Sequence, residues 1–192
     1  PSRSLRPMPA PHPLLLLGAI FLAFAAFTLF WLRREYAQRG RLSAFGSALH
    51  LAVYCVNGAF VGISIWGPVG VPPMHGAAWL GVPLMVGGLA LTVLAMDGFR
   101  QFSRWLGSAT PGLKTGGLYR YSRNPQFVAY GALILGAVIA WGNPLGVLGL
   151  ASYLALAYAV ARIEEEHLAR IYGQDYLDYC ARVPRFVGWP GR

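Results

Sequence analysis

The residues best suited to chemistry gather in two clusters in the second half of the chain. The first cluster combines arginines with tyrosines and paired glycines, and the second is a run of three carboxylates. Guanidinium groups bind carboxylates, carboxylates bind ammonium groups or ribose hydroxyls, and aromatic rings cover flat rings. Glycines let a backbone approach a ligand closely. We expect a site for a zwitterionic, nucleoside-containing cofactor, formed by Trp105, Gly116, Gly117, Tyr119, Arg120, Tyr121, Arg123, Glu164 and Glu165.

The elements that position these clusters are apolar blocks. Of the 192 residues, 56% are hydrophobic and only 12% are charged, and the blocks approach the roughly 20 helical residues that cross a bilayer. We predict an all-α integral membrane protein with five transmembrane helices. The last two form a tight hairpin, in which Gly142 ends one helix and Pro144 lies in the first turn of the next. The five predicted spans are 14–32, 44–66, 77–96, 127–141 and 145–161.

The distribution of arginine and lysine orients the predicted spans. Connections 33–43 and 97–126 and the C-terminal tail are basic, whereas 67–76 and the 142–144 turn have no Lys or Arg. Because short cytoplasmic loops carry the excess of basic residues, we expect a multi-pass protein, in the inner membrane if bacterial, with its N-terminus outside and its C-terminus in the cytosol. The hairpin then brings residues 115–125 and 164–167 together on the cytosolic face, where a C-terminal helical segment closes the cofactor pocket.

Other site classes find little support. The net charge of +9 is explained by topology and by contact with an anionic lipid bilayer, so we expect no nucleic-acid partner. Cys55 and Cys180 are far apart, and neither they nor the scattered histidines have metal-ligand spacing, so we predict no metal. The clusters also have structural interpretations. Arg120 and Arg123 suit interfacial anchors, Tyr119 and Tyr121 an aromatic belt, Asp97 a solvent contact at a helix end, and Glu166 with Arg170 a surface ion pair.

Motifs in residues 113–192 preserve the order and spacing of a known family. The first group is Leu113-Lys-Thr-Gly-Gly-Leu-Tyr119 with Ser122-Arg-Asn-Pro125. The second is Glu164-Glu-Glu-His-Leu168, then Tyr172-Gly173, Tyr176, Tyr179 and Arg182-Val-Pro184. Together with the 142–144 turn they resemble the motifs of isoprenylcysteine carboxyl methyltransferases and phospholipid N-methyltransferases. Asn124 departs from the histidine that is commoner at its position, and the first three spans resemble the family only in hydropathy.

The resemblance implies methyl transfer from S-adenosylmethionine to a lipophilic or small acceptor at the cytosolic membrane face. It implies one membrane domain, in which residues 1–112 serve the acceptor and residues 113–192 bind the cofactor. Arg182 and Glu165 are the expected catalytic residues, and Arg182 would orient an acceptor carboxylate. The expected cofactor-binding residues are Gly117, Tyr119, Arg123, Asn124, Pro125, Glu164 and Glu165, and the expected acceptor-binding residues are Arg182, Arg185, Tyr176 and Tyr179.

The acceptor stays open at this point. The resemblance favours an isoprenylcysteine carboxylate, and a phospholipid amine or a small thiol is the alternative. A carboxylate needs no base, whereas an amine or thiol must lose a proton to a group such as Glu164, Glu165, Tyr176 or Asp97. Two further hypotheses are a membrane reductase similar to sterol reductases, which would use a nicotinamide cofactor, and a non-catalytic membrane scaffold.

Overall fold

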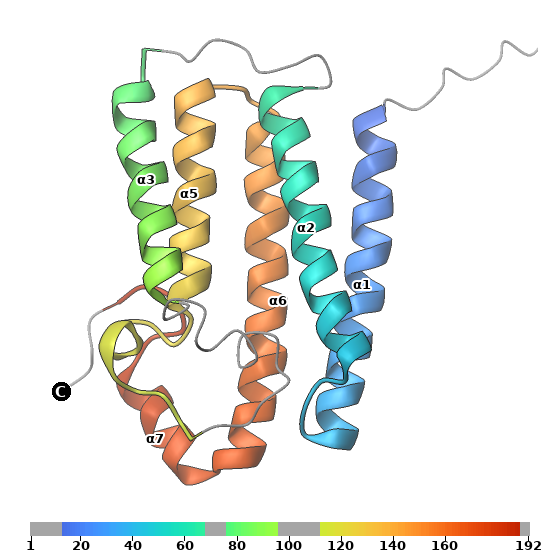
Figure 1. The fold of residues 1–192 in the computed structure, drawn as a ribbon, viewed down its shortest axis with the longest axis vertical. Helices are drawn as coiled ribbons and strands as arrows, with labels where there is room; N and C mark the ends of the chain where they lie inside the picture. The colour runs from blue at the N-terminus through green and yellow to red at the C-terminus, as the bar shows by residue number, and fades with distance from the viewer. Residues whose placement is uncertain (1–12, 68–75, 96–111, 189–192) are drawn as a thin grey trace, which may run out of the picture.

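The chain folds into a bundle of helices that run roughly alongside one another (Figure 1). The computed structural model describes residues 13–67, 76–95 and 112–188, and these residues contain no strand. Four of the helices are long and apolar enough to cross a bilayer, namely α1, α2, α3 and α6. The described elements are α1 (Pro13–Arg39), α2 (Ala44–Trp66), α3 (Ala78–Ala95), the 3-10 helix η1 (Gly117–Arg120), α5 (Pro125–Trp141), α6 (Gly146–Tyr172) and α7 (Gln174–Arg182).

Two helices extend well beyond the predicted spans. Helix α1 continues past residue 32 to Arg39, because good helix formers follow and the first breaker is Gly40, with φ of 65°. Helix α6 continues past residue 161 to Tyr172, so the three consecutive carboxylates lie on this helix and not on a segment after it. Hydropathy predicts where a helix leaves the hydrocarbon core of the bilayer. It does not predict where the helix ends, because polar residues with high helix propensity can extend it.

Helix α5 is the shortest of the five predicted spans. It begins at Pro125, two residues before the predicted start, because proline suits the first helical position. Its 17 residues cover about 26 Å at 1.5 Å per residue, less than the roughly 30 Å of a hydrocarbon core. The described residues therefore support four spans by length, and the predicted count of five goes beyond what this helix shows.

The connection between α5 and α6 forms the predicted tight hairpin. Gly142 adopts the left-handed conformation, with φ of 62°, and ends α5 as expected. Pro144 precedes α6, which starts at Gly146, so the prediction that Pro144 lies in the first helical turn is wrong. Asn143 stabilises the turn instead: its Nδ2 donates to the Ile65 carbonyl oxygen at 2.9 Å, and its Oδ1 accepts from the Leu145 amide at 3.0 Å.

Helices α3 and α5 lie side by side along their length (Figure 1), and glycines make this close approach possible. A Cβ atom on Gly88 would lie 2.6 Å from the Leu133 nitrogen and 2.7 Å from the Ala129 oxygen. One on Gly81 would lie 2.5 Å from the Gly136 oxygen. Small residues at such contacts are the usual basis of helix association in membranes. The glycines thus hold α5 against α3, and α5 begins directly after the predicted site residues.

A buried tyrosine connects α6 to the beginning of α5. Tyr153 is fully buried in the apolar core, and its hydroxyl donates to the Phe127 carbonyl oxygen at 2.7 Å. That oxygen belongs to the first turn of α5, next to the predicted cofactor-binding residues. Tyr153 therefore helps to fix the axial position of α5 relative to α6.

Replacing Tyr153 with phenylalanine should lower stability modestly. The change removes one buried hydrogen bond, while the Phe127 carbonyl keeps its place in the helix, so the cost is about 0.5–1.5 kcal/mol. We expect a lower melting temperature in detergent. Tyr121→Phe is the matched control, since the Tyr121 side chain is exposed, and it should melt like the wild type. Equal melting of the Tyr153 variant and the wild type would contradict this role.

The regions with chemistry-capable residues lie at one end of the bundle. The α1–α2 turn, the segment before α5, the end of α6 and α7 all lie there (Figure 1). Contacts between α1 and α6 confirm the arrangement: Arg33 forms a 3.2 Å ion pair with Glu166, and the Tyr36 and His167 rings stack at 4.1 Å. The predicted grouping of the described basic segments at one end is thus observed, and the side of the membrane that this end faces stays a prediction.

Candidate active site

The site is built around the lead-in, which is the segment of residues 116–124 that precedes α5. Gly117 opens η1 with φ of 62°, a conformation that favours glycine. After η1, the Ser122 hydroxyl accepts a hydrogen bond from the Asn124 amide at 3.1 Å and shapes the turn into α5. Asn124 stands at the N-cap of α5, but its side chain makes no capping bond there. The amide group of Asn124 is therefore available to another segment.

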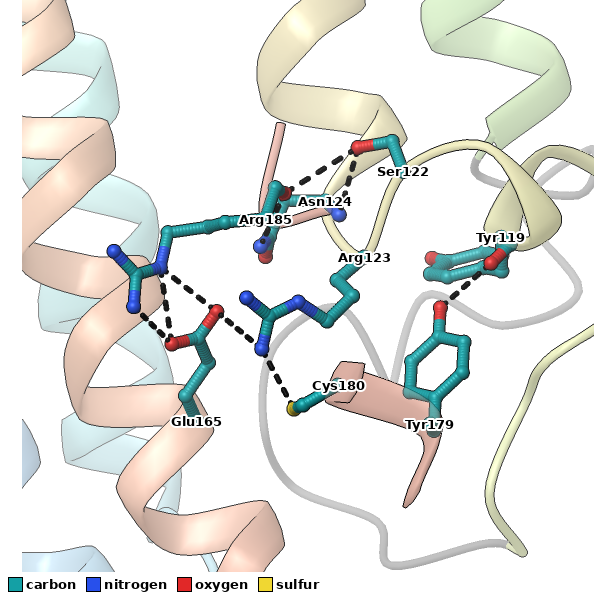
Figure 2. A network of polar contacts seen from close by, with 8 residues as sticks. All are labelled: Tyr119, Ser122, Arg123, Asn124, Glu165, Tyr179, Cys180 and Arg185. Atoms are coloured by element: carbon teal, nitrogen blue, oxygen red, sulfur yellow. Dashed lines mark hydrogen bonds and ion pairs between the residues drawn. The ribbon is translucent and has the colours of Figure 1, made fainter. Parts of the chain in front are cut away.

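That other segment is the tail, which we define as residues 183–188. The Arg123 backbone amide donates to the Pro184 carbonyl oxygen at 3.0 Å. Asn124 Nδ2 donates to the Arg185 carbonyl oxygen at 3.1 Å, and Ser122 Oγ donates to the same oxygen at 3.4 Å (Figure 2). The Ser-Arg-Asn motif thus holds the tail in place, although some 60 residues separate the two in sequence.

The three consecutive carboxylates have three different surroundings. Successive helical residues are about 100° apart around the axis, so neighbours point to different elements. Glu166 forms its ion pair with Arg33 on α1. The predicted Glu166–Arg170 ion pair is not observed, because Arg170 Nε donates to the Glu166 backbone oxygen instead. Glu164 interacts electrostatically with the phenols of Tyr36 and Tyr54. No hydrogen bond or ion pair joins its carboxylate to another residue in the described part of the chain.

Glu165 is the centre of the polar network in Figure 2. Arg185 forms a bidentate ion pair with it, from Nη2 to Oε2 at 2.7 Å and from Nε to Oε1 at 2.9 Å. Arg123 approaches from the other side, with Nη1 3.2 Å from Oε1. The Arg123 and Glu165 side chains are each only 13% exposed, and that of Arg185 is 25% exposed. The hydrogen bonds that Arg185 donates to Glu165 raise the pKa of Arg185, so its guanidinium stays charged.

Tyrosines of α7 complete this end of the site. Tyr176 and Tyr179 are buried together with Val183, and the Tyr179 hydroxyl donates to the Tyr119 carbonyl oxygen at 2.7 Å (Figure 2). Burial raises the pKa of both phenols above their usual range. Both phenols therefore stay protonated near neutral pH, so Tyr176 is a poor candidate for a general base.

The structure brings most of the predicted residues together. Arg182 is the exception: its side chain is exposed, and its Nε donates to the Asp178 backbone oxygen one turn earlier on α7. Asp97 and Trp105 lie outside the described residues. The other predicted residues lie in the lead-in, the first turn of α5, the neighbouring turn of α6, α7 or the tail. They are Gly117, Tyr119, Arg123, Asn124, Pro125, Glu164, Glu165, Tyr176, Tyr179 and Arg185.

Sequence reasoning missed two members of the network. Cys180 accepts a hydrogen bond from Arg123 Nη1 at 2.6 Å, and Ser122 bonds to both Asn124 and the tail. Their positions carried a signal, because Cys180 follows Tyr176 by one helical turn and Ser122 lies inside the recognised motif. Neither residue type suggests a role alone, so only the contacts reveal them.

A known protein family matches much of this chain. The family model described as phospholipid methyltransferase matches residues 77–175, just over half of the chain. The chain belongs to the phospholipid methyltransferase family. Neither curated proteins nor solved structures gave a match. As a phospholipid methyltransferase family member, the protein belongs to a family of membrane methyltransferases.

The family match refines where the shared part of this methyltransferase family member begins. It starts at residue 77, in the third predicted span, and not at residue 113, where the motif resemblance begins. It therefore includes α3, the lead-in, α5 and α6 and ends inside α7. Helices α1 and α2 and the tail lie outside the match, so the contacts of Arg185 with the matched region are known from the structure alone.

Proposed function

We propose that the protein is an integral membrane methyltransferase that uses S-adenosylmethionine and acts on a lipophilic or small acceptor at the cytosolic membrane face. The observation that carries this proposal is the Arg123–Glu165–Arg185 network at one end of an apolar bundle, in a chain of the phospholipid methyltransferase family. Family membership supplies the reaction class. The network supplies a charged and partly buried site close to the bilayer.

The residues present fit the cofactor by their chemistry. S-Adenosylmethionine carries a carboxylate, an ammonium group, a ribose and an adenine ring. Arginines suit the carboxylate, the Glu164 carboxylate suits the ammonium or ribose hydroxyls, and the Tyr119 ring suits the adenine. Two buried polar atoms, Arg123 Nε in the network and Gln126 Oε1 in the first turn of α5, also have no hydrogen-bond partner among the described residues. Unpaired buried polar atoms are costly, and a polar ligand would satisfy them.

The protein's own contribution to methyl transfer would be mainly positional. When bound, the cofactor supplies an electrophilic methyl group on a sulfonium, which is already a good leaving group. The chain would align the acceptor with that methyl group and exclude water. Arg185 and Arg182 are the proposed groups for an acceptor carboxylate, with Tyr176 and Tyr179 beside them. Glu164, which the structure leaves without a hydrogen-bonded partner among described residues, is the better proton acceptor for an amine.

The proposed topology has five spans with the site on the cytosolic side. Helix α5 would cross together with the lead-in turn, which adds length to its 17 helical residues. The basic residues at the site's end of the bundle support the cytosolic placement. Residues 1–112 would then serve the acceptor, and residues 113–192 would bind the cofactor.

Two acceptor classes follow from two observations. Arg182 and Arg185 favour a carboxylate acceptor, as in isoprenylcysteine carboxyl methyltransferases, whose motif Arg182-Val-Pro184 resembles. The carboxylate of Glu164 favours an amine, as in a phospholipid headgroup. Transfer of a radiolabelled methyl group to N-acetyl-S-farnesylcysteine and to phosphatidylethanolamine vesicles would separate the two. The first acceptor has a free carboxylate and a blocked amine, and the second has a free amine and no carboxylate.

The cofactor itself gives the most direct test of the proposed function. Isothermal titration calorimetry of the detergent-solubilised protein should show binding of S-adenosylmethionine and none of NADPH, because the proposed site matches a methyl donor. Binding of NADPH alone would support a membrane reductase. Binding of neither would favour a non-catalytic scaffold and contradict the proposal.

A further inference from the structure

Both carboxylate oxygens of Glu165 are already engaged by arginines. Oε1 accepts from Arg185 Nε at 2.9 Å and pairs with Arg123 Nη1 at 3.2 Å. Oε2 accepts from Arg185 Nη2 at 2.7 Å. A ribose hydroxyl or an ammonium group would have to displace charge-assisted hydrogen bonds, which are among the strongest in proteins. Glu165 is therefore poorly placed to bind a ligand directly.

The network also carries an excess of positive charge. The three groups joined by these ion pairs sum to a net charge of +1, since the Arg123 and Arg185 cations outnumber the Glu165 anion. Neither arginine pairs with Glu164. Burying an uncompensated charge is unfavourable unless a partner neutralises it. In addition, Arg123 Nε is buried and lacks a hydrogen-bond partner in the described part of the chain. An oxyanion would neutralise the excess positive charge and would accept a hydrogen bond from Arg123 Nε.

We infer that Arg123 and Arg185 form a clamp for an oxyanion of the ligand, and that Glu165 is a positioning residue that fixes the two guanidinium groups. The inference rests on the proposed function and reassigns Glu165, which would act through the arginines and not on the ligand itself. The oxyanion is a carboxylate or a phosphate. It belongs either to the amino-acid end of the cofactor or to the acceptor.

The backbone contacts explain why this clamp would be well ordered. The lead-in holds the Pro184 and Arg185 carbonyls, which fixes the position from which the Arg185 side chain starts. Glu165 then fixes the other end of that side chain from α6 (Figure 2). The Arg185 guanidinium also lies over the Tyr158 ring, 5.3 Å from its centroid. Arg182, by contrast, has no such contact with α6 among the described residues, so the clamp uses Arg185.

A pair of ligands distinguishes positioning from direct binding. S-Adenosylhomocysteine carries a carboxylate and an ammonium group, whereas 5′-methylthioadenosine shares its adenosine and thioether but lacks both. If the oxyanion comes from the cofactor, Glu165→Gln and Arg123→Gln should each lower the affinity for S-adenosylhomocysteine at least about tenfold, as expected for a lost charge-assisted contact. The affinity for 5′-methylthioadenosine should stay within about twofold, because this ligand does not touch the clamp.

If the oxyanion comes from the acceptor, both affinities stay unchanged in these variants, and the KM for the methylated acceptor rises instead with little change in kcat. Glu166→Gln is the control for charge on α6, since Glu166 pairs with Arg33 away from the clamp, and it should behave like the wild type. Arg185→Lys, which keeps the charge but loses the bidentate geometry, provides a second variant if Glu165→Gln does not fold.

Three outcomes would overturn the inference. Glu165→Gln would weaken both ligands equally if Glu165 bound the ribose. Affinities and the KM would all match the wild type if the network were only structural. An Arg185→Lys protein with unchanged affinities and KM would show that the bidentate guanidinium of Arg185 does not bind the oxyanion. Failure of the wild type to bind any of these ligands would instead contradict the proposed function, so the two failures are distinguishable.

Discussion

Leucine in place of Gly88 is expected to separate α3 from α5 and to abolish the folded site. Even the first atom of the new side chain would lie 2.6 Å from the Leu133 nitrogen and 2.7 Å from the Ala129 oxygen, and a backbone cannot yield as a side chain does. Overpacking typically costs about 1–3 kcal/mol, and the whole leucine side chain adds to that cost. We expect a strongly lowered melting temperature, rapid proteolysis in detergent and loss of ligand binding.

The neighbouring glycine provides a close control for this prediction. A Cβ atom on Gly87 would have no heavy atom within 4 Å, so Gly87→Leu adds the same side chain to the same helix at an open position. This variant should keep the wild-type melting temperature and ligand affinity. The packing argument would be wrong if the two variants behaved alike.

Asn124→Leu is expected to loosen the tail and to lower methyl transfer about fivefold to tenfold. The buried amide of Asn124 donates to the Arg185 carbonyl oxygen, and leucine cannot replace that bond. The Ser122 hydroxyl, 3.4 Å from the same oxygen, is the weaker donor that remains. Loss of the Asn124 bond therefore costs about 1–1.5 kcal/mol, which corresponds to about a fivefold to tenfold smaller share of molecules with the tail held against the lead-in. Limited trypsin digestion should show faster cleavage at Arg182 and Arg185, because protease reaches a detached tail more easily.

Histidine at the same position tests the chemistry of the contact. Asn124→His restores a ring N–H that can donate to the Arg185 carbonyl, so it should protect the tail better than leucine does. Its digestion rate should fall between those of the wild type and Asn124→Leu. A histidine variant digested as fast as the leucine variant would mean that the hydrogen bond does not hold the tail.

The positions of the membrane helices could be predicted from the sequence, because a bilayer requires long apolar helical segments. Hydropathy located α1, α2, α3 and α6, and glycine conformation located the end of α5 at Gly142. The length of α6 could not be predicted, because its polar last turns pack against α1 and are not limited by the hydrocarbon core. The Tyr36–His167 stack and the Arg33–Glu166 pair are long-range contacts that no local pattern encodes.

The glycines show the same limit. The chain has 24 of them, and adjacent ones such as Gly87 and Gly88 look equivalent in sequence. Only the second meets the backbone of another helix. The side of α3 that faces α5 depends on how the two helices pair, so sequence alone cannot say which glycine is indispensable.

By itself the sequence determined that this is a multi-span membrane protein of a methyltransferase family, with carboxylates and arginines at one end. It could not assign partners within those clusters. In the tertiary structure Glu165 pairs with two arginines and Glu166 pairs with Arg33 on α1, since consecutive helical residues point in different directions. Arg185 and not Arg182 contacts α6, because α7 ends at Arg182 and the lead-in holds the Pro184 and Arg185 carbonyls beside the site.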